Sequence, residues 1–272
     1  MTTAPPGEDR SELWLALLRR LTAASPSWAV HGEVAEGFAG TGDVDLVAPA
    51  EELARVEHEF RTWASHSGLG PVVSCRHRPG ALILVTPGST GTPLFELEVR
   101  YERYFKGWTA WRAEDLAPVA VMHADGYRCL RPGAAGLLKL VPNGLRPGGR
   151  PKWSAAKRER VAERLRRDPE GVQMAAALFG RARRAVSAGA DSVAAGGWDR
   201  RAMVAAEMWA LAYAAAEGRG MVARARFRAR GDRRCLVLST IGDHDRVIEG
   251  DPARWLALVA EDHTVTPAPS PQ

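Results

Sequence analysis

The segment Gly42–Val47, with the sequence GDVDLV, constrains the fold more than any other part of this 272-residue chain. Its polar and apolar residues alternate and Pro49 ends the run, which predicts a β-strand over Asp43–Pro49. On such a strand Asp43 and Asp45 point to the same face, about 6.5 to 7 Å apart. Val44 and Leu46 point to the other face, into a core. The strand therefore belongs to a sheet with one buried face and one acidic face.

The elements around this strand predict an α+β fold with a mixed sheet in the first half of the chain. The expected helices begin at Ser11 and cover 51–66; the expected further strands are Trp28–Gly32, two runs around Pro79-Gly80, and Leu94–Tyr101. We expect these elements to form one domain over residues 1–150.

The second half of the chain is predicted to be mainly helical, as a domain over residues 151–272. Arg131-Pro132 opens a helix before it, and further helices are expected at 154–167, 171–186 and 199–218, with 189–197 as a linker. Residues 234–250 predict a β-hairpin with its turn at Gly242-Asp243. A short helix is expected to follow from Asp251, with Pro252 at its first position.

Composition bounds the class of protein. Hydrophobic residues make up 46% of the chain, yet no run of about 18 uncharged apolar residues exists, so we expect no membrane span. Cys75, Cys129 and Cys235 are widely spaced and form no CxxC pair. This usage, and an acidic N-terminus unlike a secretory signal, predict a cytoplasmic location.

The net charge of +5 is concentrated in one segment and indicates an anionic partner. Residues 139–184 hold 13 basic and 4 acidic side chains. Lys139 and Lys152 are candidate phosphate ligands, because an ammonium group offers a point charge to phosphate oxygens. For residues 157–167 the alternative is a solvated helix face, on which Glu159 and Glu163 pair with basic neighbours. No recognised nucleic-acid motif accompanies the segment.

Two aspartates on one face of a strand repel each other, and a shared divalent cation would relieve that repulsion. Mg²⁺ binds carboxylate oxygens and bridges substrate phosphates. The alternative is a pair of solvated aspartates at a strand edge. Two other polar features favour ordinary structure: Asp243-His244-Asp245 is typical of a polar hairpin turn, and His31 is expected to be a hydrogen-bonded histidine at a strand end.

The string VHGEVAEGFAGTGDVDLV resembles the nucleotidyltransferase superfamily, which has the polymerase-beta-like fold. The family pattern is a strand, Gly-Ser on a short helix, and about ten residues later Asp-x-Asp on the next strand; Gly32 and Asp43 have this spacing. The resemblance covers about residues 28–142. It implies a third carboxylate from a later strand, where LFELEV offers Glu96 and Glu98 on one face. It favours Glu96 and puts Glu98 at a histidine position.

Two residues depart from the family pattern. Glu33 stands where the family has serine, and Glu36 stands where small-molecule members have arginine. In the family the Gly-Ser segment holds the β- and γ-phosphates. A carboxylate there would repel a triphosphate unless it turns away or pairs with a cation.

The resemblance implies a nucleotidyltransferase that uses Mg²⁺ or Mn²⁺ and takes an NTP, such as ATP, as substrate. Asp43 and Asp45 would bind two metals with Glu96, and Glu98 is the further candidate ligand. Gly32, Glu33, Lys139 and Lys152 are the candidate nucleotide contacts. A small-molecule acceptor is expected, with RNA or protein as alternative acceptors. The alternative function, motivated by Glu33 and Glu36, is a catalytically silent member that binds a nucleotide, a nucleic acid or a protein.

Overall fold

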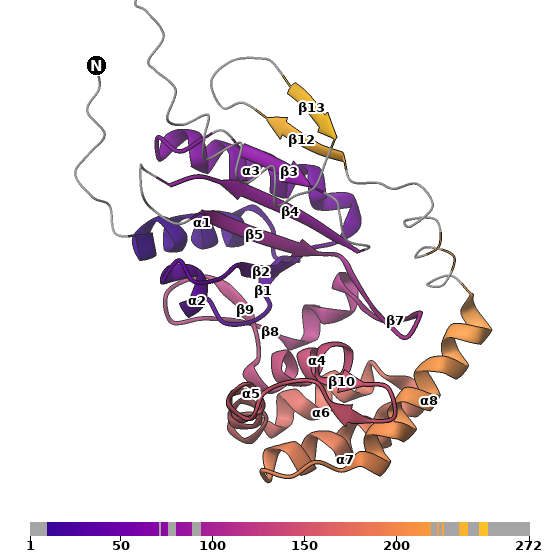
Figure 1. Ribbon diagram of the computed structural model, residues 1–272. Coiled ribbons are helices and arrows are strands. Elements are labelled where there is room, and N and C mark those ends of the chain that lie inside the picture. Colours follow the sequence, from indigo (N-terminus) through magenta and orange to yellow (C-terminus); the bar gives the residue numbers. More distant parts are fainter. Residues whose placement is uncertain are drawn as a thin grey trace, which may run out of the picture.

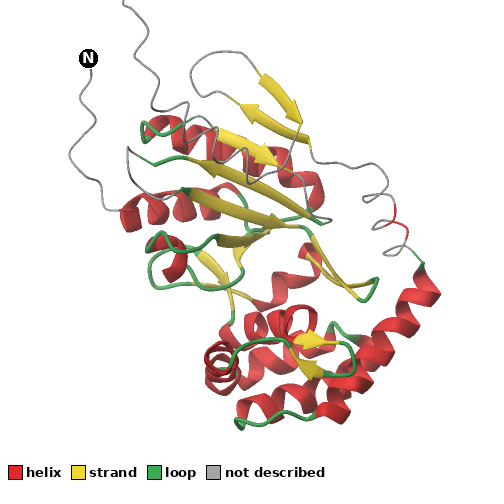
Figure 2. Ribbon diagram, viewed as in Figure 1, coloured by secondary structure: helices red, strands yellow, loops and turns green. Residues whose placement is uncertain are grey.

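A mixed β-sheet lies between two groups of helices in the computed structural model of the chain (Figures 1 and 2). The structure describes residues 10–70, 72–75, 80–88, 94–218, 222 and 225, together with the backbone of two strands at 234–238 and 245–249. This arrangement is α/β in composition, with helices and strands in one molecule.

The order of the described strands across the sheet is β13-β12-β3-β4-β5-β2-β1-β9-β8. β2 pairs with β5 and β1 with β9 in parallel, and the other neighbours are antiparallel. The strands are β1 (Ala29–Val30), β2 (Val44–Val47), β3 (Val72–Cys75), β4 (Ala81–Thr86), β5 (Phe95–Arg100), β8 (Ala120–Met122), β9 (Arg128–Leu130), β12 (Arg234–Leu238) and β13 (Asp245–Glu249).

The helices flank this sheet and form most of the second half of the described chain. They are α1 (Arg10–Ala24), α2 (Ala35–Phe38), α3 (Leu53–His66), α4 (Pro132–Gly144), α5 (Ala155–Arg167), α6 (Pro169–Ala177), α7 (Arg183–Ala194) and α8 (Arg200–Glu217). Short 3-10 turns cover 50–52, 113–119 and 180–182, and two small ribbons pair β6 (Glu102–Phe105) with β7 (Trp108–Arg112) and β10 (Leu145–Arg146) with β11 (Arg150–Pro151).

Helices α1 and α3 cover one face of the sheet and bury its apolar side chains. Val44 and Leu46 of β2 belong to this core together with Leu97 and Val99 of β5. The Trp63 indole N–H on α3 donates to the Leu13 carbonyl on α1 at 3.1 Å, which ties the two helices together. The period-two alternation of β2 and β5 therefore leaves their polar side chains on the opposite face.

Helices α4 to α8 lie on the other side of the sheet and share a second core with the β6–β7 ribbon (Figure 1). Ala29 and Val47 join this core from the sheet. α4 packs against α5 and α6, so it groups with the helices that follow it rather than with α1 and α3. The polar face of β2 and β5 is thus turned toward the helical half of the molecule.

The strand over 43–49 and the helix over 51–66 form where the sequence predicts them, as β2 and α3. Two helical predictions were wrong. Residues 189–197 are not a linker, because α7 runs to Ala194, and the helix expected over 171–186 breaks near Gly180, whose φ of +52° no helix interior allows. The β6–β7 ribbon was not predicted.

The C-terminal predictions fall partly outside the described residues. β12 and β13 pair antiparallel, as the two arms of the predicted hairpin would. The turn at Gly242-Asp243 and the helix expected from Asp251 lie outside the described residues. Within the part of the chain that the structure describes, none of the helices combines the length and the apolar character that crossing a membrane requires.

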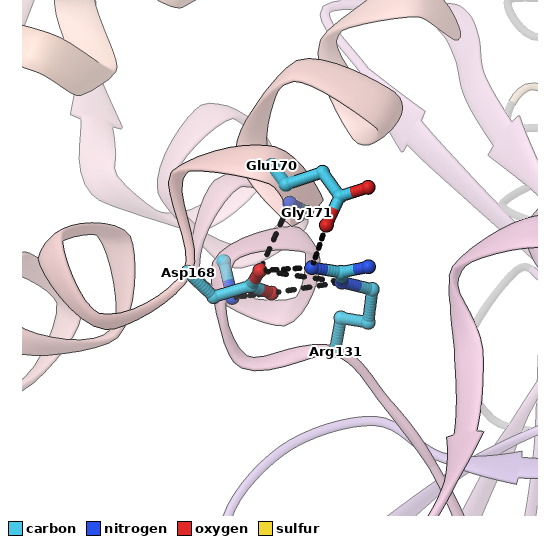
Figure 3. A network of polar contacts seen from close by, with 5 residues as sticks. Arg131, Asp168, Glu170 and Gly171 are labelled. Atoms are coloured by element: carbon cyan, nitrogen blue, oxygen red, sulfur yellow. Dashed lines mark hydrogen bonds and ion pairs between the residues drawn. The ribbon is translucent and has the colours of Figure 1, made fainter.

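An ionic network centred on the buried Asp168 fixes the junction between α4 and α6 (Figure 3). The Asp168 carboxylate accepts hydrogen bonds from the Gly133 and Gly171 amides, both at 3.0 Å, at the start of each helix. The Arg131 guanidinium donates to Asp168 at 2.6 Å and to Glu170 at 2.7 Å. Burial alone would raise the pKa of Asp168, but these hydrogen bonds outweigh it and lower that pKa.

We expect Asp168→Ala to lower the free energy of unfolding by about 3 kcal/mol at pH 7, because Arg131 and two amides lose their partner. Glu170→Ala is the control: its side chain is 73% exposed, and the substitution should cost no more than about 0.5 kcal/mol.

The effect of Asp168 should depend on pH. Since the folded-state pKa of Asp168 is lowered, its contribution to stability is present above the unfolded pKa. The deficit of the variant should therefore shrink as pH falls below about 4. Urea unfolding at pH 7 and below pH 4 measures this deficit. Equal losses of stability in Asp168→Ala and Glu170→Ala would contradict the role given to Asp168.

Candidate metal centre

Three carboxylates meet on the polar face of the sheet. Asp43 precedes β2, Asp45 lies within it, and Glu98 lies directly opposite Asp45 in the parallel register of β2 and β5. Each offers one oxygen, and these oxygens all lie within 4.8 Å of one another. Glu98 is 2% exposed, so the cluster reaches into the interior of the molecule.

The third member of this cluster is Glu98, whereas the resemblance favours Glu96. Both residues lie on the same face of β5, as predicted, but the register aligns Asp45 with Glu98, and Glu96 stands two residues earlier, opposite Val85 of β4. Of the two glutamates, it is Glu98 that the strand register brings to Asp43 and Asp45. Glu98 was among the candidate metal ligands, and the strand pairing is what distinguishes the two.

Within the described part of the chain, Arg100 and Lys139 lie beside the cluster. Arg100 Nη2 lies 2.7 Å from Glu98 Oε1, and Arg100 Nε lies 3.8 Å from Asp45 Oδ1. Lys139 Nζ on α4 lies 4.0 Å from Asp45 Oδ2. Lys139 of the basic segment thus lies beside the cluster. Lys152 is exposed, and its backbone amide donates to the Gly144 carbonyl at 2.8 Å.

The positive charge of Arg100 and Lys139 does not fully balance the cluster. Burial and, after it, the Asp43 carboxylate raise the pKa of Asp45 to about 6, against the opposing effect of Lys139 and Arg100. A raised carboxyl pKa means that the site would accept more positive charge. Three carboxylates at this spacing are hard oxygen donors, which fits Mg²⁺ or Mn²⁺.

Gly32 brings the chain close to Asp45. Its φ is +142°, and a Cβ there would lie 3.4 Å from Asp45 Oδ2 and 4.0 Å from Lys139 Nζ. The segment after it is anchored from α1, because Arg10 Nε and Trp14 Nε1 both donate to the Gly37 carbonyl, at 2.9 and 3.0 Å. Gly37 in turn has no room for a side chain, since a Cβ would approach Val44 Cγ2 to 2.5 Å.

Glu33 and Glu36 are paired with arginines of α5. Arg164 Nη2 lies 2.5 Å from Glu33 Oε1, and Arg160 Nη2 lies 3.3 Å from Glu36 Oε1. This is the cation pairing under which a carboxylate near a phosphate site would be tolerated. On the same helix Arg166 lies 2.6 Å from Glu159 and 2.9 Å from Glu163. This part of residues 157–167 therefore matches the alternative of a solvated helix face whose charges pair with one another.

His31 differs from its prediction. It is 4% exposed, and neither ring nitrogen has a hydrogen-bond partner within the described part of the structure. Burial lowers the pKa of His31 well below its usual value, and Lys139 and Arg100 lower it further, so the imidazole is neutral. Its backbone amide donates to the Asp45 carbonyl at 2.8 Å, which joins the end of β1 to β2. The ring stands 5.6 Å from that of Trp111, between centroids.

Comparison of the chain with protein-family models, with curated proteins and with solved structures finds no match. The assignment of a function therefore depends on the residues and geometry of the site.

We expect Asp45→Asn to stabilise the metal-free protein at pH 8 by about 1–3 kcal/mol, because it removes a carboxylate that burial and Asp43 disfavour. Asp45 has a raised folded-state pKa, so its charge destabilises the folded chain above about pH 6. This penalty declines between pH 6 and pH 4 and is absent below the unfolded pKa. Urea unfolding of both proteins across this range tests it, and a variant less stable than wild type at pH 8 would show that the cluster is balanced.

Proposed function

We propose that the protein is a metal-dependent nucleotidyltransferase that transfers a nucleoside monophosphate from an NTP to an acceptor, most simply a small molecule. The observation that carries the proposal is the convergence of Asp43, Asp45 and Glu98, with Gly32 beside Asp45. The resemblance of the sequence to the nucleotidyltransferase superfamily implies this arrangement. It consists of a strand that ends in glycine, a neighbouring strand with Asp-x-Asp, and a third carboxylate from a later strand.

The three carboxylates would hold Mg²⁺ or Mn²⁺. When bound, the metal supplies charge stabilisation for the phosphates and lowers the pKa of an acceptor hydroxyl. Arg100 orients two of its ligands, since it contacts both Glu98 and Asp45. Lys139 stands beside Asp45 with its ammonium group directed at the same region, where it can bind a phosphate oxygen.

A catalytically silent member of the same fold is the second candidate. The pairing of Glu33 with Arg164 favours it, because this carboxylate stands where the family binds phosphate. Arg100 favours it as well, since its guanidinium already contacts two of the three acids. Such a protein would bind its ligand without a requirement for a divalent cation.

The two glutamates of β5 form a matched pair that tests the proposal. In the presence of Mg²⁺ or Mn²⁺ and the NTP that the protein binds, we expect the wild-type melting temperature to rise by about 5 °C. Glu98→Gln and Asp43→Asn should abolish this rise, because they remove metal ligands. Glu96→Gln, on the same face two residues away, should keep it. Scanning fluorimetry with each NTP, with and without metal, makes the measurement, and circular dichroism checks that each variant folds.

Transfer of label from an α-labelled NTP into a small-molecule extract, RNA or protein then identifies the acceptor class. If none of the NTPs gives a metal-dependent shift, the silent alternative replaces the enzyme. If Glu96→Gln loses the shift while Glu98→Gln keeps it, the assignment of the third ligand is wrong.

A further inference from the structure

Two cysteines that lie far apart in the sequence meet in the sheet. β12 pairs antiparallel with β3, and the register of their backbones sets Cys235 directly opposite Cys75. The same register continues along both strands as far as Leu238, which stands opposite Val72. The backbone position of Cys235 relative to Cys75 therefore follows from a run of consecutive strand pairs.

The backbone spacing at this pair suits a disulfide. Directly opposite residues of two antiparallel strands have Cα atoms about 4.5 or 5.5 Å apart, according to the hydrogen bonding of the pair. Their Cβ atoms leave the same face of the sheet. A disulfide requires Cα atoms about 4.4 to 6.8 Å apart. Both kinds of antiparallel pair fall within this range, so the register permits a bond between residues 75 and 235.

The strand order excludes Cys129 as a partner. Cys129 lies on β9, and β4, β5, β2 and β1 stand between β9 and β3. Because neighbouring strands are about 4.8 Å apart, roughly 24 Å of sheet separates Cys129 from Cys75. Cys235 is one strand further away. Of the pairings that the three cysteines of the chain allow, only that of Cys75 with Cys235 lies within reach of one bond.

The β3 side of this pair is enclosed by the rest of the molecule. The residues of β3 are all buried, and Cys75 is 4% exposed. β3 is also paired along both of its edges, with β4 and with β12. A disulfide at this position would be shielded from thiols in solution, which slows its reduction.

We propose that Cys75 and Cys235 form an intramolecular disulfide that ties β12 and β13 to the sheet, with glutathione disulfide as the oxidant. One thiolate of the pair attacks glutathione disulfide, breaks its S–S bond and releases one glutathione. The second thiolate attacks the resulting mixed disulfide, forms the Cys75–Cys235 bond and releases the other glutathione. The two cysteine protons end on the released glutathiones, and two electrons pass from the cysteines to the oxidant.

The bond would join distant parts of the chain. Residues 75 to 235 include α4 to α8, so all of these helices would lie inside one covalent loop. A disulfide that closes a long loop restricts the unfolded chain, and the oxidised protein should therefore be more stable than the reduced one. The bond shares no residue with the proposed metal centre and does not depend on nucleotidyl transfer.

Thiol counting and peptide mapping of the full chain test the proposal. After incubation with glutathione disulfide, the denatured wild type should show one reactive thiol in place of three and run as a monomer on a non-reducing gel. Mass spectrometry should identify a peptide pair linked through Cys75 and Cys235. Cys129→Ala is the matched control and should keep the bond, whereas Cys75→Ala and Cys235→Ala should each lose it. Burial raises the pKa of Cys129, which favours its remaining a thiol.

The melting temperature gives a second measurement. Oxidation should raise it by about 5 °C in wild type and in Cys129→Ala, and should leave it unchanged in Cys235→Ala. The Asp43→Asn, Asp45→Asn double variant should form the same bond, which separates this site from the proposed metal centre. The proposal is overturned if three thiols remain after oxidation, if the linked peptide contains Cys129, or if the bond joins two copies of the chain.

Discussion

The parallel pairing of β2 with β5 is the constraint on which the candidate site depends. It sets Asp45 beside Glu98. The apolar residues that alternate with these acids hold the register, because Val44 and Leu97 are fully buried against α1 and α3. A slip of either strand by one residue would turn its carboxylate into that core and its apolar side chains out of it. The same packing that stabilises the sheet therefore forces two acids together, and Arg100 on the same face of β5 offsets part of the repulsion.

The helical half supplies most of the remaining positive charge. Lys139 of α4 faces the cluster, and Arg160 and Arg164 of α5 face the two glutamates after β1. The basic segment over 139–184 thus lies against acidic residues from the first half of the chain. The position of these helices matters for the site. The partly buried contact of Arg131 with Asp168 helps to fix it, since it joins the starts of α4 and α6 (Figure 3).

The sequence predicts the parts of this structure that depend on local pattern. Alternation identifies β2 and its acidic face, and the spacing of Leu53, Val56 and Phe60 identifies α3. It could not choose between Glu96 and Glu98, because both lie on one face and only the register of a distant strand separates them. The β6–β7 ribbon had a signal that was missed: aromatic residues flank Lys106-Gly107, and both of these residues have positive φ in the turn.

Glu33 and Glu36 are the residues at which sequence pattern and electrostatics disagree most, and their pairing changes what they mean. The resemblance expects an arginine at the position of Glu36, and the structure places Arg160 of α5 against that position instead. Positive charge is thus present near the glycine segment, but it comes from another element and is already paired. An anion can reach it only by displacing a carboxylate. For partly exposed pairs that displacement costs about 1 kcal/mol, so the exchange weakens anion binding without abolishing it.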